Sequence, residues 1–210
     1  MSTPEPSPKR RLAAGERRDV IEQAATRVFA ERGYRGASIE AIARRAGVSA
    51  PVIYDHFSGK VDLYRRLLER TRNELLEMWR EHLFGDEPAE VRMPRAIAAW
   101  ASYVEGHREQ TRMFFREATG DPEAEAAHRE IQAQARVALG MVLAREPGAE
   151  HVAGSGEQEA LEMAAEVVRA GLVGLGLWWH DHPHVPRERV VQVAVNVVWV
   201  GLERARRSPD

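Results

Sequence analysis

The sequence predicts an all-α protein in which a small three-helix head precedes a larger helical body. Apolar residues recur at helical spacing along most of the 210 residues, and Gly and Pro divide the chain into segments of helix length. The Val-rich run at 190–200 has strand propensity but finds no partner strand elsewhere. We expect a tail at 1–15, the head at 16–60 and the body at 61–210.

The first helix of the head is predicted at 17–32. One apolar face recurs there at intervals of four, three and one residues, and Gly33 follows as a stop signal. The residues of this face are Ile21, Ala25, Val28 and Phe29.

Two short helices joined by a tight turn are predicted between 38 and 60. Ser38 can cap the first of them, and Gly47 supplies the backbone freedom for the turn that ends it. Its apolar face consists of Ile39, Ile42, Ala43 and Ala46. This arrangement is typical of a helix-turn-helix, which places its second helix in the major groove of DNA.

The second of these helices is predicted to begin at Ser49, which can cap it, and to hold Pro51 in its first turn. Ile53, Tyr54 and Phe57 can pack against the preceding helix. For Tyr54 and Phe57 a purely structural role is the alternative to a role at DNA. We therefore expect sequence-specific DNA binding, carried by this helix.

Residues 17–68 resemble the N-terminal domain of the tetracycline-repressor (TetR) family of transcriptional regulators. The order and spacing of four short elements carry the resemblance, which covers about a quarter of the chain. These elements are 29–34 (FAERGY), 38–43 (SIEAIA), 46–49 (AGVS) and 54–57 (YDHF), followed by Lys60 and Leu63.

The resemblance implies a set of DNA contacts. Ser38 and Lys60 match positions that bind phosphate, and Tyr54 and His56 match positions that touch phosphate or a thymine methyl group. Ala50 and Pro51 depart from the family pattern, where Lys and Gly are common. The candidate DNA-binding residues are Ser38, Ser49, Ala50, Pro51, Val52, Tyr54, His56 and Lys60.

The body is predicted to be helical throughout, with Pro- and Gly-containing breaks between the helices. The run at 190–200 is assigned to the last helix because Gln192 and Asn196, four residues apart, form one polar stripe. The expected helices are 61–84, 89–107, 109–119, 122–145, 157–181 and 187–206.

The last two helices are unusually apolar and contain small residues that allow a close approach of another backbone. An apolar area of this size favours an interface, and the resemblance implies a homodimer with two helices from each subunit. The alternative is that both helices lie inside the core of the monomer. The candidate interface residues are Gly171, Gly174, Trp178, Val191, Val195 and Trp199.

Aromatic and Met residues of the body are candidates for the wall of a ligand cavity, with a few polar groups among them. Ordinary core packing is the alternative for each of them, and the existence of a cavity is implied by the resemblance. The candidate ligand-binding residues are Trp100, Tyr103, His107, Phe114, Phe115, Met141 and Trp178.

Charge is divided unevenly along the chain. Residues 1–66 carry 13 Lys and Arg against 8 Asp and Glu, whereas the other 144 residues carry 17 against 24, so the net charge of −2 hides a basic head. The tail, which holds Lys9, Arg10 and Arg11 among Pro and Ser, is expected to be disordered in the free protein. It either reaches a minor groove or only improves solubility.

Several classes of function are disfavoured. The chain has no Cys, no apolar signal segment at its N-terminus and no uncharged run long enough for a membrane span, which suits a cytoplasmic protein. No catalytic or cofactor motif is present, so neither an enzyme nor a cofactor is expected. The sequence predicts a homodimeric regulator, favoured as a repressor, that binds double-stranded operator DNA and is released by a small apolar or aromatic effector. The alternatives are a metal-responsive regulator using His180, His182 and His184, and a helical enzyme of unknown activity.

Overall fold

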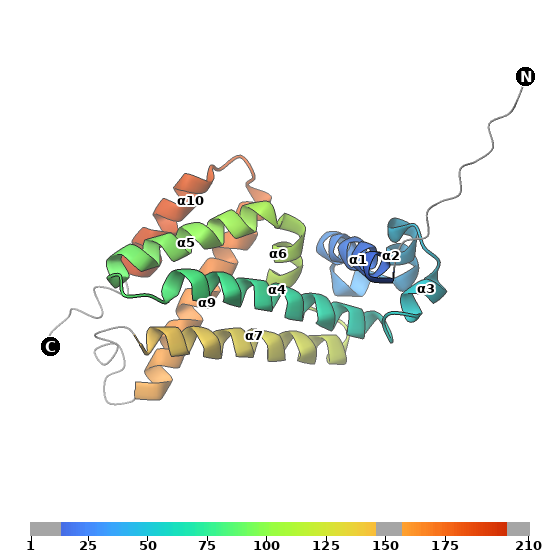
Figure 1. Cartoon of the computed structure of the whole chain (residues 1–210), viewed down its shortest axis with the longest axis horizontal. Coiled ribbons are helices and arrows are strands. Elements are labelled where there is room, and N and C mark those ends of the chain that lie inside the picture. The colour runs from blue at the N-terminus through green and yellow to red at the C-terminus, as the bar shows by residue number, and fades with distance from the viewer. Residues whose placement is uncertain (1–13, 146–156, 201–210) are drawn as a thin grey trace, which may run out of the picture.

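The computed structural model describes residues 14–145 and 157–200, and these residues form helices and no strands (Figure 1). The all-α expectation is confirmed for this part of the chain. The predicted tail up to residue 13, the predicted break at 146–156 and the predicted helical residues 201–206 lie outside the described residues. The helices are α1 (Ala14–Gly36), α2 (Ile39–Ala46), α3 (Ala50–Tyr54), α4 (Lys60–Leu83), α5 (Ala89–Gly106), α6 (Arg108–Phe115), α7 (Pro122–Leu143), α9 (Glu157–Asp181) and α10 (Arg187–Ala194).

Most helix ends lie within two residues of the positions expected from the sequence, whereas both ends of α1 and the end of α6 differ by three or four residues. α1 does leave helical geometry at Gly33, where φ is 68°, but one more helical turn follows as far as Gly36. α6 ends at Phe115 and not at residue 119, because Arg116 adopts an extended conformation. The segment after it carries Asp121 back to the head, where the Tyr34 hydroxyl donates a hydrogen bond of 3.2 Å to its carboxylate.

Local capping explains why the head folds as two short helices and a turn. The Ser38 hydroxyl accepts a hydrogen bond of 3.1 Å from the amide of Ala41 and so satisfies one unpaired donor at the start of α2. Gly47 ends α2 in the left-handed conformation, with φ of 70°, and its N–H bonds to carbonyls of the last turn. Ser49 precedes α3 with extended backbone, but its side chain makes no capping hydrogen bond.

The helix α4 joins the head to the body. It runs from the head at one end of the molecule through the body, where it packs against α5 and α7 (Figure 1). At its start, the Asp62 carboxylate accepts hydrogen bonds from the backbone and hydroxyl of Ser58. At its end, Leu83 is buried. One continuous helix therefore contacts both parts of the molecule.

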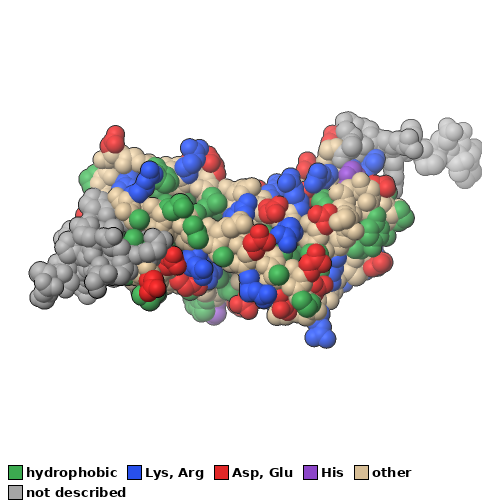
Figure 2. Space-filling view, turned by 90° about the horizontal axis from the view of Figure 1, so that it is seen from below, with side chains coloured by type: hydrophobic (Ala, Val, Ile, Leu, Met, Phe, Trp, Pro, Cys, Tyr) green, Lys and Arg blue, Asp and Glu red, His purple; other side chains and the backbone are tan. Residues whose placement is uncertain are grey.

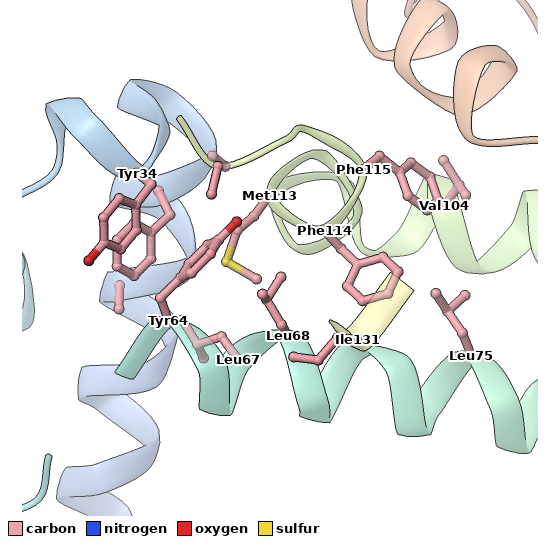
Figure 3. Packing of buried hydrophobic residues seen from close by; sticks show 14 of the residues in the cluster. Tyr34, Tyr64, Leu67, Leu68, Leu75, Val104, Met113, Phe114, Phe115 and Ile131 are labelled. Carbon is pink, nitrogen blue, oxygen red and sulfur yellow. The ribbon is translucent and has the colours of Figure 1, made fainter. Parts of the chain in front are cut away.

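Most buried apolar side chains belong to one hydrophobic cluster that continues from the head into the body. Figure 3 shows the junction, where Tyr34 from α1 and Tyr64 from α4 lie near Met113 from α6, and Phe114 lies further into the body. The ring of Tyr64 lies 5.0 Å from the ring of Tyr34 and 5.0 Å from that of Phe29. The head is therefore packed onto the body and is not joined to it by a linker alone.

The final described segment has two parts. α10 begins after Pro186 and gives way to a π-helical turn at Val195–Trp199. The expectation of a helix over the Val-rich run is confirmed for these residues, although five of them have π-helical geometry. α10 and this turn pack against α5, as the arrangement in Figure 1 shows for α10.

Candidate nucleic-acid interface and ligand cavity

The helix α3 presents a small surface whose inner side is fixed by Ile53, which is completely buried. Tyr54, next to it in sequence, is 54% exposed, so of the two possibilities for this side chain the structure favours the surface role. Pro51 and Ser49 are also exposed, and Val52 is half-buried. An exposed aromatic side chain on a short helix held by a buried neighbour is a suitable group for reading a DNA groove.

Other predicted DNA contacts also have structural roles. Ser38 caps α2, and Phe57 is buried, which confirms the structural interpretation for that ring. His56 and Ala50 are half-buried at the edge of the head. The DNA contacts of Ser38, Ala50 and His56 stay predictions.

Lys60 has a role that sequence reasoning did not anticipate. Its ammonium group donates hydrogen bonds to the carbonyls of Tyr34, at 3.2 Å, and Ala37, at 3.1 Å, and it lies 4.1 Å from the centre of the Tyr34 ring. These contacts join the start of α4 to the end of α1. A contact with phosphate stays a prediction, and it would have to share the ammonium group with these bonds.

The space-filling view shows basic and acidic side chains mixed over one face of the molecule (Figure 2). The attraction of the head for phosphate therefore depends on which individual basic side chains are exposed and which are paired with a carboxylate. Arg44, in the last turn of α2, is exposed, whereas its neighbour Arg45 pairs with Glu31 at 2.6 Å. Arg44 is a candidate phosphate contact that the sequence motif did not identify, because a single Arg in a helix gives no periodic signal.

A cavity of about 710 Å³ lies in the body, between α4, α5, α6, α7 and α9. This volume is in the range of sites for small molecules and cofactors. Its walls are mostly aliphatic and aromatic. Its polar lining residues are Arg72, Arg80, Gln132, Arg145 and Arg169.

Four of the predicted ligand-binding residues line this cavity, namely Trp100, Phe114, Phe115 and Met141. The other three lie elsewhere, and for them the predicted placement needs correction. The Tyr103 hydroxyl donates to Glu74 at 2.7 Å, and burial together with this carboxylate raises the pKa of the tyrosine. The His107 ring stacks on Tyr103, and the Trp178 ring stacks on His182 at the surface. They share helical spacing with the true wall residues but face other directions.

Sequence reasoning missed the wall that α4 contributes. Leu75, Leu76, Trp79 and Leu83 line the cavity from this helix, and Leu172 lines it from α9. Their helical spacing marks an apolar side of each helix. Only the packing of five helices decides whether a buried side faces a cavity or solid core.

A row of polar contacts leads from the cavity to the head. The Arg169 guanidinium donates to the side-chain oxygen of Gln132 at 3.3 Å, and the Gln132 amide nitrogen lies 3.4 Å from the His128 ring. On its other side, the His128 ring shares a hydrogen bond of 3.0 Å with the Tyr64 hydroxyl. Burial lowers the pKa of His128, so its ring is neutral at neutral pH. The Tyr64 ring lies 5.0 Å from the Tyr34 ring of the head, with an angle of 56° between the two planes. The contacts therefore continue from the lining of the cavity to the head.

The outer side of α9 is open in the monomer. A Cβ added to Gly171 or Gly174 would meet nothing within 4 Å, and Trp178 is 46% exposed. Gly176 differs, because a Cβ there would lie 2.7 Å from the Phe115 ring of the same chain. This glycine serves the monomer's own packing. The sequence could not separate it from its neighbours.

On the corresponding side of α10 and the π-helical turn, some side chains are exposed and others are half-buried or buried. Val191 and Val195 are half-buried, and Val193 and Val197 are exposed. Trp199 is buried, with 5% exposure. Its predicted place at a dimer interface needs correction, because its indole ring packs in the core of its own chain.

The histidines near the end of α9 are engaged in separate contacts. His180 lies 3.1 Å from the Thr111 hydroxyl, and the His182 ring bonds to the carbonyl of Trp178. His184 is exposed, and its ring centre lies 6.0 Å from that of His182. Within residues 14–145 and 157–200, no three potential ligand side chains are close enough to hold a metal ion. The metal-responsive alternative is not favoured.

The model of the family described as bacterial regulatory proteins, tetR family, matches residues 21–67, which span the helix-turn-helix. Residues 21–67 are therefore those of a TetR-family DNA-binding domain, which supports a TetR-family transcriptional regulator. The regulator's described residues also contain no helix both long and apolar enough to cross a bilayer.

Two relatives indicate how far the similarity extends. The regulator is 28% identical over 198 residues to the HTH-type transcriptional activator FasR of Mycolicibacterium smegmatis. The aligned residues cover 91% of this chain and 85% of that protein. It is 31% identical over 99 residues to the transcriptional repressor BepR of Brucella suis, covering 46% of this chain and 47% of that protein. The first similarity includes the body, whereas the second covers about half of each chain.

Among solved structures, the regulator is similar to the transcriptional regulator FadR of Bacillus subtilis, crystallised with stearoyl-CoA. The TM-score is 0.68, with 19% identity over 91% of this chain and 99% of that chain. At this identity the likeness establishes a shared fold.

Proposed function

We propose that the regulator binds operator DNA as a homodimer and loses affinity for it when an apolar molecule fills the 710 Å³ cavity. The observation that carries this proposal is the course of α4. Its first residue, Lys60, bonds to the head, whereas Leu75 and Leu83 near its other end line the cavity. A ligand that displaces this end of α4 would change the position of the head.

The lining of the cavity supports an amphiphilic ligand with an acidic group. Arg80 and Arg169 are paired with the carboxylates of Glu77 and Glu166. By contrast, Arg145 lies over the Phe84 ring. Arg72 contacts the side-chain amides of Asn73 and Gln134. These two cations contact neutral groups and lie beside an apolar space, which suits an anion attached to a hydrocarbon.

The relatives support the same class of ligand. The structurally similar FadR of Bacillus subtilis was crystallised with stearoyl-CoA, which joins a long acyl chain to an anionic group. We extend this class to the present regulator because its own cavity combines apolar walls with Arg72 and Arg145. Aromatic acids of similar polarity are the second class to be tested.

The row of contacts from Arg169 to Tyr64 supports a route by which a ligand would act. A ligand group that bonds to Arg169 or Gln132 would compete with the bonds that orient His128. His128 in turn bonds to Tyr64, whose ring packs against Tyr34 of the head. Coupling of this kind is a difference in the free energy of ligand binding between two states of the protein.

We favour a repressor, as the sequence suggested, in which ligand binding releases the operator. The open sides of α9 and α10 support assembly as a two-fold dimer, which would hold two recognition helices about one DNA turn apart. The relatives include a named activator and a named repressor, so the direction of control is tested by transcription of a reporter gene with and without ligand.

The proposal is tested with a duplex selected by the protein from random-sequence DNA. Palmitoyl-CoA, free palmitate and aromatic acids are titrated while melting temperature and operator affinity are measured. We expect an active ligand to raise the melting temperature by mass action and to lower operator affinity at least about tenfold. If none of these compounds changes either quantity, the proposal is wrong.

Two substitutions on α7 provide a matched pair for this test. Ala138 lines the cavity, so the ring introduced by Ala138→Phe should occupy part of it and weaken the response to ligand while leaving operator binding intact. Ala126 is exposed on the same helix, so Ala126→Phe should change neither property.

Tyr64→Phe keeps the aromatic ring but removes the hydroxyl that bonds to His128. We expect it to retain ligand binding and to weaken the release of DNA.

A further inference from the structure

A second cavity of about 40 Å³ lies beside the first one and differs from it in chemistry. All the residues that line it are apolar, and its far wall is formed by α5 and by Val198 and Trp199 of the π-helical turn. A cavity of this size is large enough for about two or three water-sized groups, but an apolar cavity of this kind stays dry. Protein interiors contain few such voids, because each one forfeits packing contacts.

The two cavities share part of their walls. Five residues line both of them, so these residues lie between the two spaces. Trp79 is the largest of the five, and it packs against the main hydrophobic cluster and against the smaller cluster of Leu83, Ala96 and Val142. The shared residues are Trp79, Leu83, Leu139, Val142 and Leu172.

We propose that the second cavity receives the end of the effector's hydrocarbon chain, and that the Trp79 ring sets the longest chain that the regulator accepts. The inference rests on the proposed function, because it requires an apolar ligand in the first cavity. The charged groups Arg72 and Arg145 line only the first cavity, so an amphiphile anchored there would direct its apolar end away from them. The second cavity offers that end a space without polar groups, next to the wall that the two cavities share.

The position of the second cavity links the length of the effector's hydrocarbon chain to DNA binding. Trp199 lines this cavity, whereas Val197 in the same π-helical turn is 70% exposed on the side proposed for the dimer. A hydrocarbon end in the second cavity would therefore press on a turn whose other side faces the partner subunit. π-helical turns often occur at functional sites. Chains that reach this cavity release the operator, whereas shorter chains fill the first cavity and release less.

The test uses a ladder of saturated ligands from octanoyl to eicosanoyl, each as a CoA thioester and as a free acid, so that the source of the acidic group is distinguished. Melting temperature and operator affinity are measured for each length. We expect the wild-type protein to show an optimum length. Trp79→Ala removes the indole ring that lies between the two cavities and adds its space to theirs, so the optimum should move to longer chains.

Two further variants make the test specific. Ala96 lines the second cavity alone, so Ala96→Val should shorten the optimum. Met141 lines the first cavity alone, so Met141→Ala should weaken all lengths equally and leave the optimum unchanged. Leu139→Ala opens the same shared wall as Trp79→Ala. This variant is used for the test if the Trp79→Ala protein does not fold.

The outcomes separate the two proposals. Opposite shifts of the optimum in the Trp79 and Ala96 variants support the second cavity as the site of the chain end. A wild-type protein that responds to the ladder, with an optimum that neither variant moves, overturns this inference and leaves the proposed function intact. A wild-type protein that responds to no ligand of any length overturns both.

Discussion

The head and the body achieve their structures in different ways. In the head, contacts between residues close in sequence fix the geometry, as when Ser38 caps α2 and Gly47 ends it. In its core, Ile42 and Ile53 are completely buried. In the body, helices far apart in sequence surround a cavity of about 710 Å³. A part that reads DNA must hold a fixed shape, whereas a part that senses a ligand must leave space for it and gives up packing contacts to do so.

The largest effect expected from this contrast is on stability. Leu63 and Leu76 lie on the same helix, but Leu63 is completely buried and Leu76 is half-buried beside the cavity. Leu63→Ala should lower the free energy of unfolding by about 2–5 kcal/mol, as for other buried leucines. Leu76→Ala should cost clearly less, because its side chain already borders empty space. Denaturant unfolding of both variants measures the difference, and equal losses would contradict the contrast.

The second effect concerns the dependence of the head on the body. Gly174→Arg places a charge on the open side of α9, where burial of an unpaired charge in an interface is costly. We expect a monomer and a loss of operator affinity on the order of 100-fold, which corresponds to about 2.7 kcal/mol. Sedimentation and DNA titration measure the two properties.

Gly106→Arg is the matched control, since this exposed glycine of α5 also has nothing within 4 Å of an added Cβ. It should change neither assembly nor affinity. A Gly174→Arg protein that remains dimeric, with unchanged affinity, would show that this side is not the interface.

The third effect separates two roles within the head. Tyr54→Ala should weaken operator binding about tenfold without a loss of stability, because this side chain is exposed. If Lys60 binds phosphate, Lys60→Ala should reduce the slope of affinity against salt by about one. If it acts only through its bonds to Tyr34 and Ala37, the variant should lose stability and keep the salt slope. Binding titrations at several salt concentrations, together with melting curves, distinguish these results.

The smallest effect is a response to acid that belongs to the body. The pKa of His180 is lowered from 6.5 to about 4 by burial, with Arg108 and Arg112 adding to the effect and Asp181 opposing it. Between these two values the unfolded chain binds a proton that the folded chain does not, so stability should fall as pH decreases from 6.5 towards 4. His180→Gln should flatten this fall. Melting temperatures at pH 7 and pH 5 test it, and an equal fall in both proteins would contradict it.

The sequence by itself determined the helix-turn-helix and the class of the protein. Ser38, Gly47 and Pro51 act on backbone groups within a few residues, so their effects can be inferred without a tertiary structure. The same applies to the fold class, because a helical apolar period depends only on the order of residues. Residues 1–13 of the predicted tail lie outside the described residues, and a role of the tail at DNA stays a prediction.

Only the tertiary structure decided which apolar residues surround a cavity. Trp100 and Tyr103 share a predicted helix face, yet only Trp100 lines the cavity, and Tyr103 bonds to Glu74 on α4. Gly174 and Gly176 look alike in sequence, yet one is open and the other lies against Phe115. Periodicity tells which side of a helix is buried. What that side meets depends on helices from distant parts of the chain, and their arrangement is set by the packing of the whole body.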